Sequence, residues 1–336
     1  MQIVRQFVLV LLLLFAGITF VLWQQFQQFM TIPINVTEQG FVYNVKQGSN
    51  LLTVSTDLQD IGLTESNRYW LYFYGRFHNK AHLIKAGEYL IQANTTLPQL
   101  LDQLVDGKVV QKPLTIVEGM TAQQLITMIS NDPRIVQTLT KHDLAFVMAQ
   151  LGLPDNHGEG EFAPETYYFS SGTTDVQLLT RAHQLMSNVL ADAWQNKADD
   201  LPYKTPYQAL IMASIIEKET GIAQERPQIA GVFVRRLKKG MRLQTDPTVI
   251  YGLGDEFNGN LQRKHLTTDT PYNTYTRSGL PPTPIALPSK ASIEAALHPA
   301  AGTSLYFVAM GKEGRHVFSD TLSEHNQAVR RYQLKK

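Results

Sequence analysis

The first thirty residues limit what this chain can fold into, because they contain a long apolar segment. Phe7 to Trp23 form a run of 17 residues, FVLVLLLLFAGITFVLW, and no charged side chain lies between Arg5 and Glu38. A helix rises about 1.5 Å per residue, so roughly 17 to 25 apolar residues cross the hydrocarbon core of a bilayer. We therefore expect residues 1–30 to be a short stub and a membrane-spanning helix, followed by a water-soluble body.

The residues behind the run favour a retained anchor over a cleaved signal peptide. A cleavage site requires small residues after the apolar core, whereas bulky Trp23, Phe26 and Phe29 follow it here. Arg5 precedes the run and no Lys or Arg follows it closely. The positive-inside rule therefore places the N-terminus in the cytoplasm and the body on the far side of the membrane. A cleaved signal peptide and a buried core helix are the alternatives.

The composition excludes several classes of function. The 30 Lys and Arg balance 29 Asp and Glu, so the chain lacks the net positive charge that is typical of nucleic-acid-binding proteins. The absence of cysteine excludes disulfides, iron–sulfur clusters, thiolate nucleophiles and Cys-ligated zinc. There is no H-E-x-x-H motif, no phosphate-binding G-x-x-x-x-G-K-[ST] loop and no G-x-S-x-G elbow. We expect no metal, no cofactor and no nucleic-acid partner.

Residues 31–110 show the pattern of a small α+β module. We expect a strand, two helices, a second strand and a third helix, near Phe41–Val45, Leu51–Asp60, Glu65–Phe77, Lys85–Ile91 and Leu97–Val105. Thr96 is a suitable cap for the last helix, and Gly107 ends it. This order of elements resembles the LysM-like modules that hold cell-wall glycans. A plain spacer domain is the alternative.

Residues 111–336 are expected to form a larger α+β domain. A strand is predicted over Val109–Val117, a helix capped by Thr121 over Ala122–Ile129, and a helix over Val176–Trp194. Glycines, acids and aromatics in Gly158–Phe169 indicate a loop. Loops of that composition serve either a functional site or packing on the core, and both interpretations stay open.

A buried helix with two carboxylates is the strongest chemical signal. Tyr207–Thr220, YQALIMASIIEKET, is apolar on every side through its middle, which predicts burial. Glu217 and Glu219 lie in its last turn, about 200° apart, so only one of them can face a given cleft. Apolar surroundings and the negative helix pole both raise a carboxyl pKa, as a general acid requires. The alternative is a purely structural role, as a solvated helix end or an ion pair with Lys218, Arg226 or Arg235.

Segments that are rich in polar residues or in proline follow this helix. Gly240–Gly252 contains Gln244, Thr245 and Asp246, groups that hydrogen-bond sugar hydroxyls and acetamides, although an Asp before Pro also opens turns and helices. We expect Gly221 to end the helix in a left-handed conformation. The prolines of Gly279–Ile285 predict an extended loop whose backbone is free to line a groove.

Taken together, these stretches resemble the endolytic murein transglycosylases of the MltG family, also called YceG-like proteins. The resemblance extends in order over nearly the whole chain. It is carried by the N-terminal anchor, KAGEY at 85–89, VEGMT at 117–121, EGEFAPETY at 159–167, ASIIEKE at 213–219, RLQTDPTVIYG at 242–252, YNTY at 272–275, GLPPTPI at 279–285, HPA at 298–300, and GRHVF at 314–318 with HN at 325–326.

The resemblance implies cleavage of the β-1,4 bond between N-acetylmuramic acid and N-acetylglucosamine inside nascent glycan strands. Such cleavage leaves 1,6-anhydro-muramoyl ends, consumes no water and requires one glutamic acid. Glu219 aligns with that acid, and Glu217 is the supporting or alternative acid. Candidates for binding the glycan are Gln244, Thr245, Asp246, Asn273 and Tyr275.

The resemblance also implies a cellular setting and partners. It places the protein in the inner membrane as a single-pass protein whose catalytic domain faces the periplasm. The expected partners are peptidoglycan glycan strands and peptidoglycan synthases. A hydrolase of the same glycan and a non-catalytic glycan-binding scaffold are the rival functions. We expect Glu225 and Arg235, which follow the helix, to form structural ion pairs.

Overall fold

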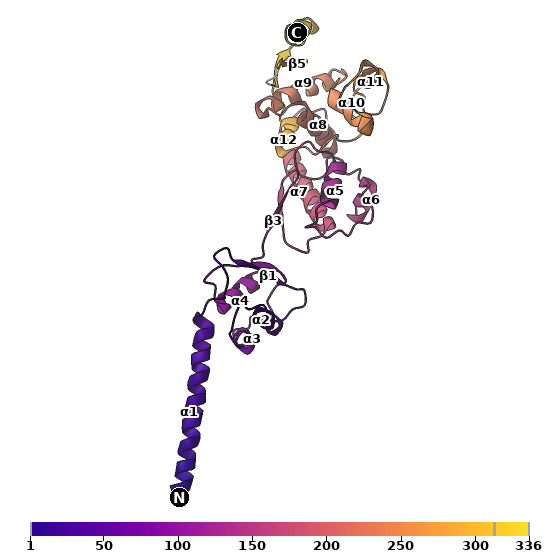
Figure 1. The fold of residues 1–336 in the computed structure, drawn as a ribbon. Coiled ribbons are helices and arrows are strands. Elements are labelled where there is room, and N and C mark those ends of the chain that lie inside the picture. The colour runs from indigo at the N-terminus through magenta and orange to yellow at the C-terminus, as the bar shows by residue number, and fades with distance from the viewer. Residues whose placement is uncertain (1, 312–313, 335–336) are drawn as a thin grey trace. The chain divides into compact units, whose positions relative to one another are not determined.

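A computed structural model describes residues 2–311 and 314–334 (Figure 1). The chain divides into two compact units. The first comprises Met1–Lys112 with Tyr168–Gly172, and the second comprises Pro113–Tyr167 with Thr173–Lys336. Helices and short two-stranded sheets are mixed along the described chain, which confirms the predicted α+β class.

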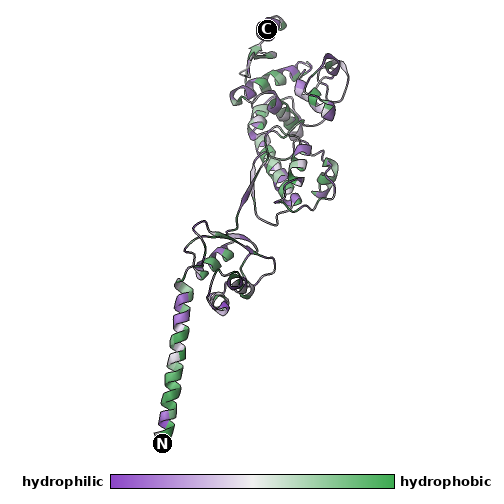
Figure 2. Cartoon of the chain, in the orientation of Figure 1, coloured by the Kyte–Doolittle hydropathy of each residue, from purple (hydrophilic) through white to green (hydrophobic). Residues whose placement is uncertain are grey.

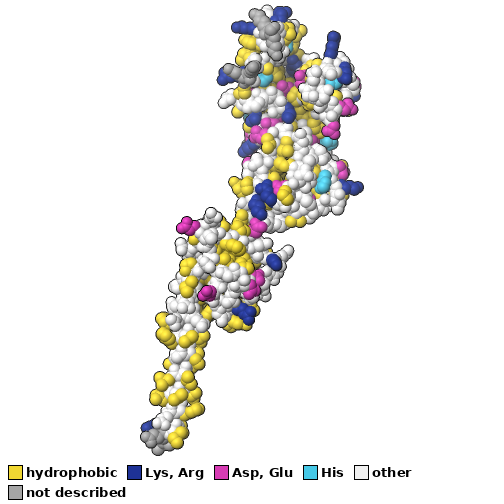
Figure 3. Space-filling view, viewed as in Figure 1, with side chains coloured by type: hydrophobic (Ala, Val, Ile, Leu, Met, Phe, Trp, Pro, Cys, Tyr) yellow, Lys and Arg dark blue, Asp and Glu magenta, His cyan; other side chains and the backbone are white. Residues whose placement is uncertain are grey.

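The N-terminal helix α1 extends over Gln2–Thr31. Its segment Ile3–Thr31 is long and apolar enough to cross a membrane by length and composition. Figure 2 shows the hydrophobic stretch giving way to polar residues before the first unit, and Figure 3 shows apolar side chains along the helix. Phe29, by contrast, is buried in the core of the first unit. The helix therefore ends inside the folded module.

The rest of the first unit follows the predicted order of elements. It contains β1 Phe41–Val45, α2 Leu51–Asp60, α3 Arg68–Phe77, β2 Gly87–Ile91 and α4 Leu97–Asp106. The two strands pair antiparallel, with Tyr43 opposite Tyr89. Helix α3 begins later than predicted, because Asn67 accepts a hydrogen bond from the Tyr69 N–H and caps the helix there. The likeness to LysM modules stays a prediction.

The second unit is mainly helical. Its elements are β3 Lys112–Thr115, α5 Ala122–Ser130, α6 Leu144–Gln150, β4 Thr166–Phe169, α7 Asp175–Gln195, α8 Pro206–Glu219, η1 Ala223–Glu225, α9 Arg226–Lys238, α10 Asp246–Leu253, η2 Gly254–Glu256, α11 Arg263–Thr267, α12 Lys290–Leu297, β5 Tyr306–Met310, β6 Arg315–Ser319 and α13 Leu322–Tyr332. Strands β3 and β4 form one sheet, and β5 and β6 form an antiparallel hairpin.

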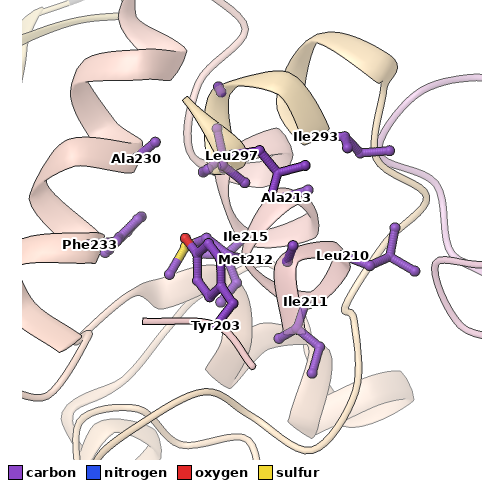
Figure 4. Packing of buried hydrophobic residues seen from close by; sticks show 14 of the residues in the cluster. Tyr203, Leu210, Ile211, Met212, Ala213, Ile215, Ala230, Phe233, Ile293 and Leu297 are labelled. Atoms are coloured by element: carbon purple, nitrogen blue, oxygen red, sulfur yellow. The ribbon is translucent and has the colours of Figure 1, made fainter. Parts of the chain in front are cut away.

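The core of the second unit surrounds α8, as predicted from its apolar sequence. Every residue from Ala209 to Ile216 is buried. Their side chains pack against α9 and α12, and Figure 4 shows Met212 near Phe233 and Ala213 near Leu297. Ser214 is accommodated because its hydroxyl donates to the Ile211 carbonyl and accepts from the Ile285 N–H. Burial on all sides fixes the end of the helix in space.

Two predicted segments near the core differ in the structure. The strand expected over Val109–Val117 is reduced to β3, because the Val110 N–H donates to Glu88 and the Gly119 N–H donates to Leu287. The loop expected over Gly158–Phe169 ends in strand β4.

The proline-rich loop and the end of α8 also differ from what the sequence predicts. Most of the segment 281–289 is buried, and the N–H groups of Ile285 and Leu287 are bonded inside the protein, so this backbone is hydrogen-bonded and not free, although Ile285 does line a cleft. Gly221 is not in the left-handed region. Helix α8 ends because Thr220 adopts an extended conformation.

Candidate active site

Glu219 lies at the last position of α8, where the apolar core meets polar residues of the following segments. Its Oε1 accepts a short hydrogen bond from the Thr245 hydroxyl. Burial and, to a smaller extent, the charge of Asp246 raise the pKa of Glu219, while the Thr245 hydrogen bond and Arg236 lower it, and together these effects bring the pKa to about 7. A carboxyl group with this pKa is substantially protonated near neutral pH and is suited to general acid catalysis.

The hydroxyl that contacts Glu219 is held by other threonines. Thr245, Thr248 and Thr274 are all buried. The Thr248 hydroxyl donates to the Thr245 carbonyl, and the Thr245 N–H donates to the Thr274 hydroxyl. The backbone of Thr245 is therefore fixed on both sides, and its hydroxyl is directed at the carboxylate. Thr245 was among the predicted glycan-binding residues, and its observed partner is Glu219.

Arg236 of α9 fixes the chain just before Thr245. Its guanidinium donates to the carbonyls of Arg242, Leu243 and Leu305, and more distantly to the Gln244 side chain at 3.4 Å. Gln244 itself is exposed and has a φ of 52°, in the left-handed region that costs a non-glycine residue energy. Gln244 has Arg236 as a side-chain partner, and its contact with the glycan stays a prediction.

Asp246 and Tyr275 form a second polar pair beside the acid. Asp246 is the first residue of α10, as an Asp-Pro pair allows, and its Oδ1 accepts a hydrogen bond of 2.6 Å from the Tyr275 hydroxyl. Burial, Asp246 and the charge of Glu219 all raise the pKa of Tyr275, so Tyr275 and Glu219 lie in one neighbourhood. The structure therefore brings Thr245, Asp246 and Tyr275 together around Glu219.

Asn273 has a different environment from the other candidates. It is buried, and its amide nitrogen donates to the carbonyls of His265 and Thr268, while its oxygen accepts from the Tyr275 N–H. Its hydrogen-bonding capacity is used to shape the loop that carries Tyr275.

Glu217 faces away from Glu219, as the helical spacing predicts. Its Oε2 accepts from the N–H and the hydroxyl of Ser289, at 2.9 and 2.5 Å, and its Oε1 lies 3.4 Å from Arg226. Ser289 is the N-cap of α12. These contacts occupy the Glu217 carboxylate in connecting α8, α9 and α12.

A buried carboxylate that the sequence patterns did not single out lies in the acidic loop. Glu159 is 2% exposed, and it accepts hydrogen bonds from the Ala122 N–H at 2.9 Å and the Tyr251 hydroxyl at 3.1 Å. Burial raises its pKa, although both hydrogen bonds oppose this. Its partner Tyr251 is 92 positions away, so only the composition of the loop hinted at a special role.

Glu159 lines a cleft of about 1150 Å³ within the second unit. The walls come from α5, α10, the loop before β4 and the segment between α11 and α12. The lining combines amides and hydroxyls with apolar and aromatic groups: Thr121, Gln123, Gln124, Thr127, Asn131, His157, Pro247, Ile250, Tyr251, Tyr272 and Ile285, with Lys218 and Asp255 at its edge. Lys218 and Pro247, the sequence neighbours of Glu219 and Asp246, line this cleft, whereas Glu219 and Asp246 themselves are not among its lining residues.

The other charged residues near α8 have structural partners. Glu225 accepts from the N–H of His316 and lies 2.7 Å from its Nδ1, in line with the expected ion pair. Arg235 instead donates to the carbonyls of Ser304 and Ala300, so its main partners are backbone oxygens. Within residues 2–311 and 314–334, no group of three His, Cys, Asp or Glu side chains is arranged to hold a metal ion.

Fold and site together define a class of protein in which one desolvated acid ends a buried helix, within a unit that also contains an amide-rich, aromatic cleft. Comparison with known proteins places the chain within that class. The model of the YceG-like family matches residues 43–331. This chain belongs to the YceG-like family.

Relatives and a solved structure agree with the family match. The endolytic murein transglycosylase of Bacillus subtilis (strain 168) is 31% identical over 306 residues, which cover 86% of this chain and 84% of that protein. The endolytic murein transglycosylase of Streptococcus pneumoniae serotype 2 (strain D39 / NCTC 7466) is 27% identical, and the match covers 89% of this chain and 59% of that protein. A crystal structure of a YceG-like protein from Listeria monocytogenes has 32% identity and a TM-score of 0.55, covering 87% of this chain and all of that one.

Proposed function

We propose that this protein is a membrane-anchored lytic transglycosylase that cleaves peptidoglycan inside its glycan strands. The names of the relatives and the site geometry support the same class of enzyme. The bond that we propose for cleavage is the β-1,4 linkage between N-acetylmuramic acid and N-acetylglucosamine. The products carry 1,6-anhydro-muramoyl ends, and the reaction trims or terminates growing strands.

Glu219 supplies both proton transfers in this mechanism. Its neutral carboxyl group donates a proton to the glycosidic oxygen as the C1–O bond breaks, and the N-acetylglucosamine side leaves with a free 4-hydroxyl. The carboxylate then takes the proton of the C6 hydroxyl while O6 bonds to C1 of the same muramoyl residue. Glu219 returns to its starting state, and no water enters. The Thr245 hydroxyl orients the carboxylate through both steps.

The observation that carries this proposal is the pKa of about 7 of Glu219 in a site where Thr245 holds its carboxylate. An acid of that strength is protonated often enough to act and is basic enough to take the proton back. Glu217 lacks this freedom because Ser289 and Arg226 occupy its oxygens.

Mass spectrometry of the products from purified peptidoglycan tests the function. We expect anhydro-muropeptides from the full-length protein and a loss of at least about 100-fold in rate for Glu219→Gln, because the amide cannot donate the proton. Normal anhydro product formation by Glu219→Gln would contradict the assignment. Glu217→Gln is the matched control and should still form anhydro products.

A hydrolase is the second candidate function, because Asp246 lies near Glu219 and a second carboxylate is what hydrolysis requires. In our proposal Asp246 instead holds the Tyr275 hydroxyl. Products that have gained one water would favour hydrolysis. Absence of any new fragment would favour a non-catalytic scaffold.

The remaining parts of the proposal concern the setting. The apolar length of α1 supports a single-pass anchor in the inner membrane with the site on the periplasmic side. We propose that the cleft contacts the glycan through its amides and aromatic rings, and that Gln244 and Tyr275 contribute beside Glu219. We also propose that the first unit binds glycan and that peptidoglycan synthases are partners. Weaker glycan binding after deletion of residues 41–106 is the expected result for the module.

A further inference from the structure

Helix α3 has an aromatic face that the first unit does not cover. Tyr69, Phe73 and Phe77 occur at intervals of four residues and so line one side of the helix. Their side chains are 45%, 58% and 85% exposed. The opposite side of the helix, with Leu71 and Gly75, is buried in the module. A ten-residue helix with this much exposed aromatic surface is adapted to contact something outside the unit.

The rings of this face are already packed on one another. Tyr69 and Phe73 have ring centroids 6.3 Å apart, and Phe73 lies 5.5 Å from Tyr72. Arg68 lies over the Tyr69 ring at 5.3 Å. Arg68 and Arg76 are exposed, and α3 contains no acidic residue. The surface therefore combines aromatic rings with positive charge, the chemistry of helices that lie in the interface of an anionic membrane.

The position of α3 beside α1 indicates that lipid head groups contact the aromatic face of α3. Trp70 contacts Phe26 of α1 at 5.5 Å between centroids, and Tyr74 contacts Phe29 at the same distance. Phe26 and Phe29 follow Trp23, the end of the apolar run, by three and six residues. At 1.5 Å per residue these contacts lie about 4.5 and 9 Å beyond the apolar run. The head-group layer on one side of a bilayer is about 5 to 8 Å thick, so the Phe26 contact lies at the depth of this layer and the Phe29 contact lies at its outer boundary.

A cavity lined by polar groups lies next to this face, at the same level along α1. It has a volume of about 770 Å³ and includes Gln25 and Gln28 of α1 together with Asn67 and Arg68 before and at the start of α3. Amide groups and a guanidinium are suited to glycerol esters and lipid phosphates, and the lining also includes the carboxylate of Glu65 and the apolar side chains of Phe29 and Trp70.

We propose that the aromatic face of α3, Tyr69, Phe73 and Phe77, lies in the lipid head-group region and fixes the first unit against the membrane surface. The inference rests on the proposed anchoring of α1. It adds a second membrane contact, which limits how far the module can tilt on its anchor and so keeps it close to newly made strands.

Fluorescence quenching in vesicles tests this proposal, and the natural chain has no cysteine to interfere. Full-length protein with a single labelled Phe77→Cys is reconstituted into vesicles of mixed phosphatidylcholine and phosphatidylglycerol. A nitroxide on the lipid head group should quench this label at least about threefold more than a label at Val42→Cys. Val42 is the matched control because it is 52% exposed on β1 of the same unit. Adding Phe73→Ser should reduce the quenching at position 77.

Three outcomes separate the proposals. A label at Leu12→Cys reports on the anchor, and its quenching by nitroxides on the acyl chains is expected. If Leu12 is quenched and position 77 is open to aqueous iodide like position 42, the anchor stands and the α3 contact is refuted. If position 77 is protected from iodide without lipid quenching, protein covers this face and the lipid assignment is wrong. If Leu12 is not quenched, both membrane proposals fail, while the glycan products remain an independent measure of the enzyme function.

Discussion

Glu219 is an acid whose strength depends on its neighbours, so the activity should follow their charge. The proposed reaction starts from the protonated form of Glu219, and the pKa of this group is about 7. The rate at low substrate should therefore be constant on the acid side and fall as the pH rises through about 7. A pH profile of the initial rate of anhydro product formation measures this, and a rate that increased through that range would contradict a general acid.

Asp246 offers a way to shift the profile. Its negative charge raises the pKa of Glu219, so Asp246→Asn should lower that pKa and move the midpoint of the profile to lower pH. The amide can still accept the Tyr275 hydrogen bond, which limits structural damage. Asp255→Asn is the control, since Asp255 is exposed at the cleft edge and should leave the midpoint unchanged. A complete loss of anhydro products with Asp246→Asn, with the fold retained, would point instead to a direct catalytic role.

At the scale of elements, Glu217 connects helices α8, α9 and α12, and we expect this connection to stabilise the folded protein. Glu217→Gln should lower the free energy of unfolding by roughly 2 kcal/mol, because it weakens charge-assisted bonds to Ser289 and Arg226. Urea denaturation measures this loss. Glu118→Gln is a matched control, since Glu118 lies 3.6 Å from the same Arg226 but is half exposed, and its effect should stay below about 0.5 kcal/mol.

The close contact between the loop 158–165 and the proline-rich segment 279–285 depends on Gly160. Its φ is +79°, and a Cβ there would lie 2.5 Å from the Pro284 ring. Gly160→Ala should therefore destabilise the protein by roughly 2–4 kcal/mol and displace the neighbouring Glu159. Gly152→Ala has the same φ but open space around it, so it should show only the backbone cost of about 1 kcal/mol. Equal thermal shifts in the two variants would refute the packing argument.

At the scale of the whole molecule, the end of the anchor helix is also part of the first unit. Phe29 is 1% exposed in the core of that unit, whereas Trp23 is exposed. Deleting residues 2–23 should release the protein from membranes and leave the module folded. Deleting residues 2–29 should in addition remove roughly 3–5 kcal/mol of stability, as expected for the loss of a buried Phe. Thermal unfolding of the two truncated proteins distinguishes these outcomes, and equal stability would show that Phe29 contributes nothing.

The elements that were predictable are those whose signals are local. Helix α2 has the predicted bounds Leu51–Asp60, and α4 ends before Gly107, whose φ is 74°. The opposite directions of Glu217 and Glu219 also follow from 100° per residue and from nothing else in the chain. Such features depend on neighbours within a few positions, so the sequence contains all the information that they need.

What only the tertiary structure decided depends on partners that are distant in sequence. The Thr245 hydroxyl meets Glu219 across 26 positions, and Ser289 meets Glu217 across 72. Glu159 joins the cleft through Tyr251, 92 positions away. Composition predicted a free proline loop and a left-handed Gly221, and both predictions were wrong because packing of the core set those backbones. The sequence by itself determined a spanning-length apolar segment, the helices and the pair of candidate acids. The fold decided which acid is held by Ser289 and Arg226 and which one meets Thr245, because hydrogen-bond occupancy arises only when distant segments meet.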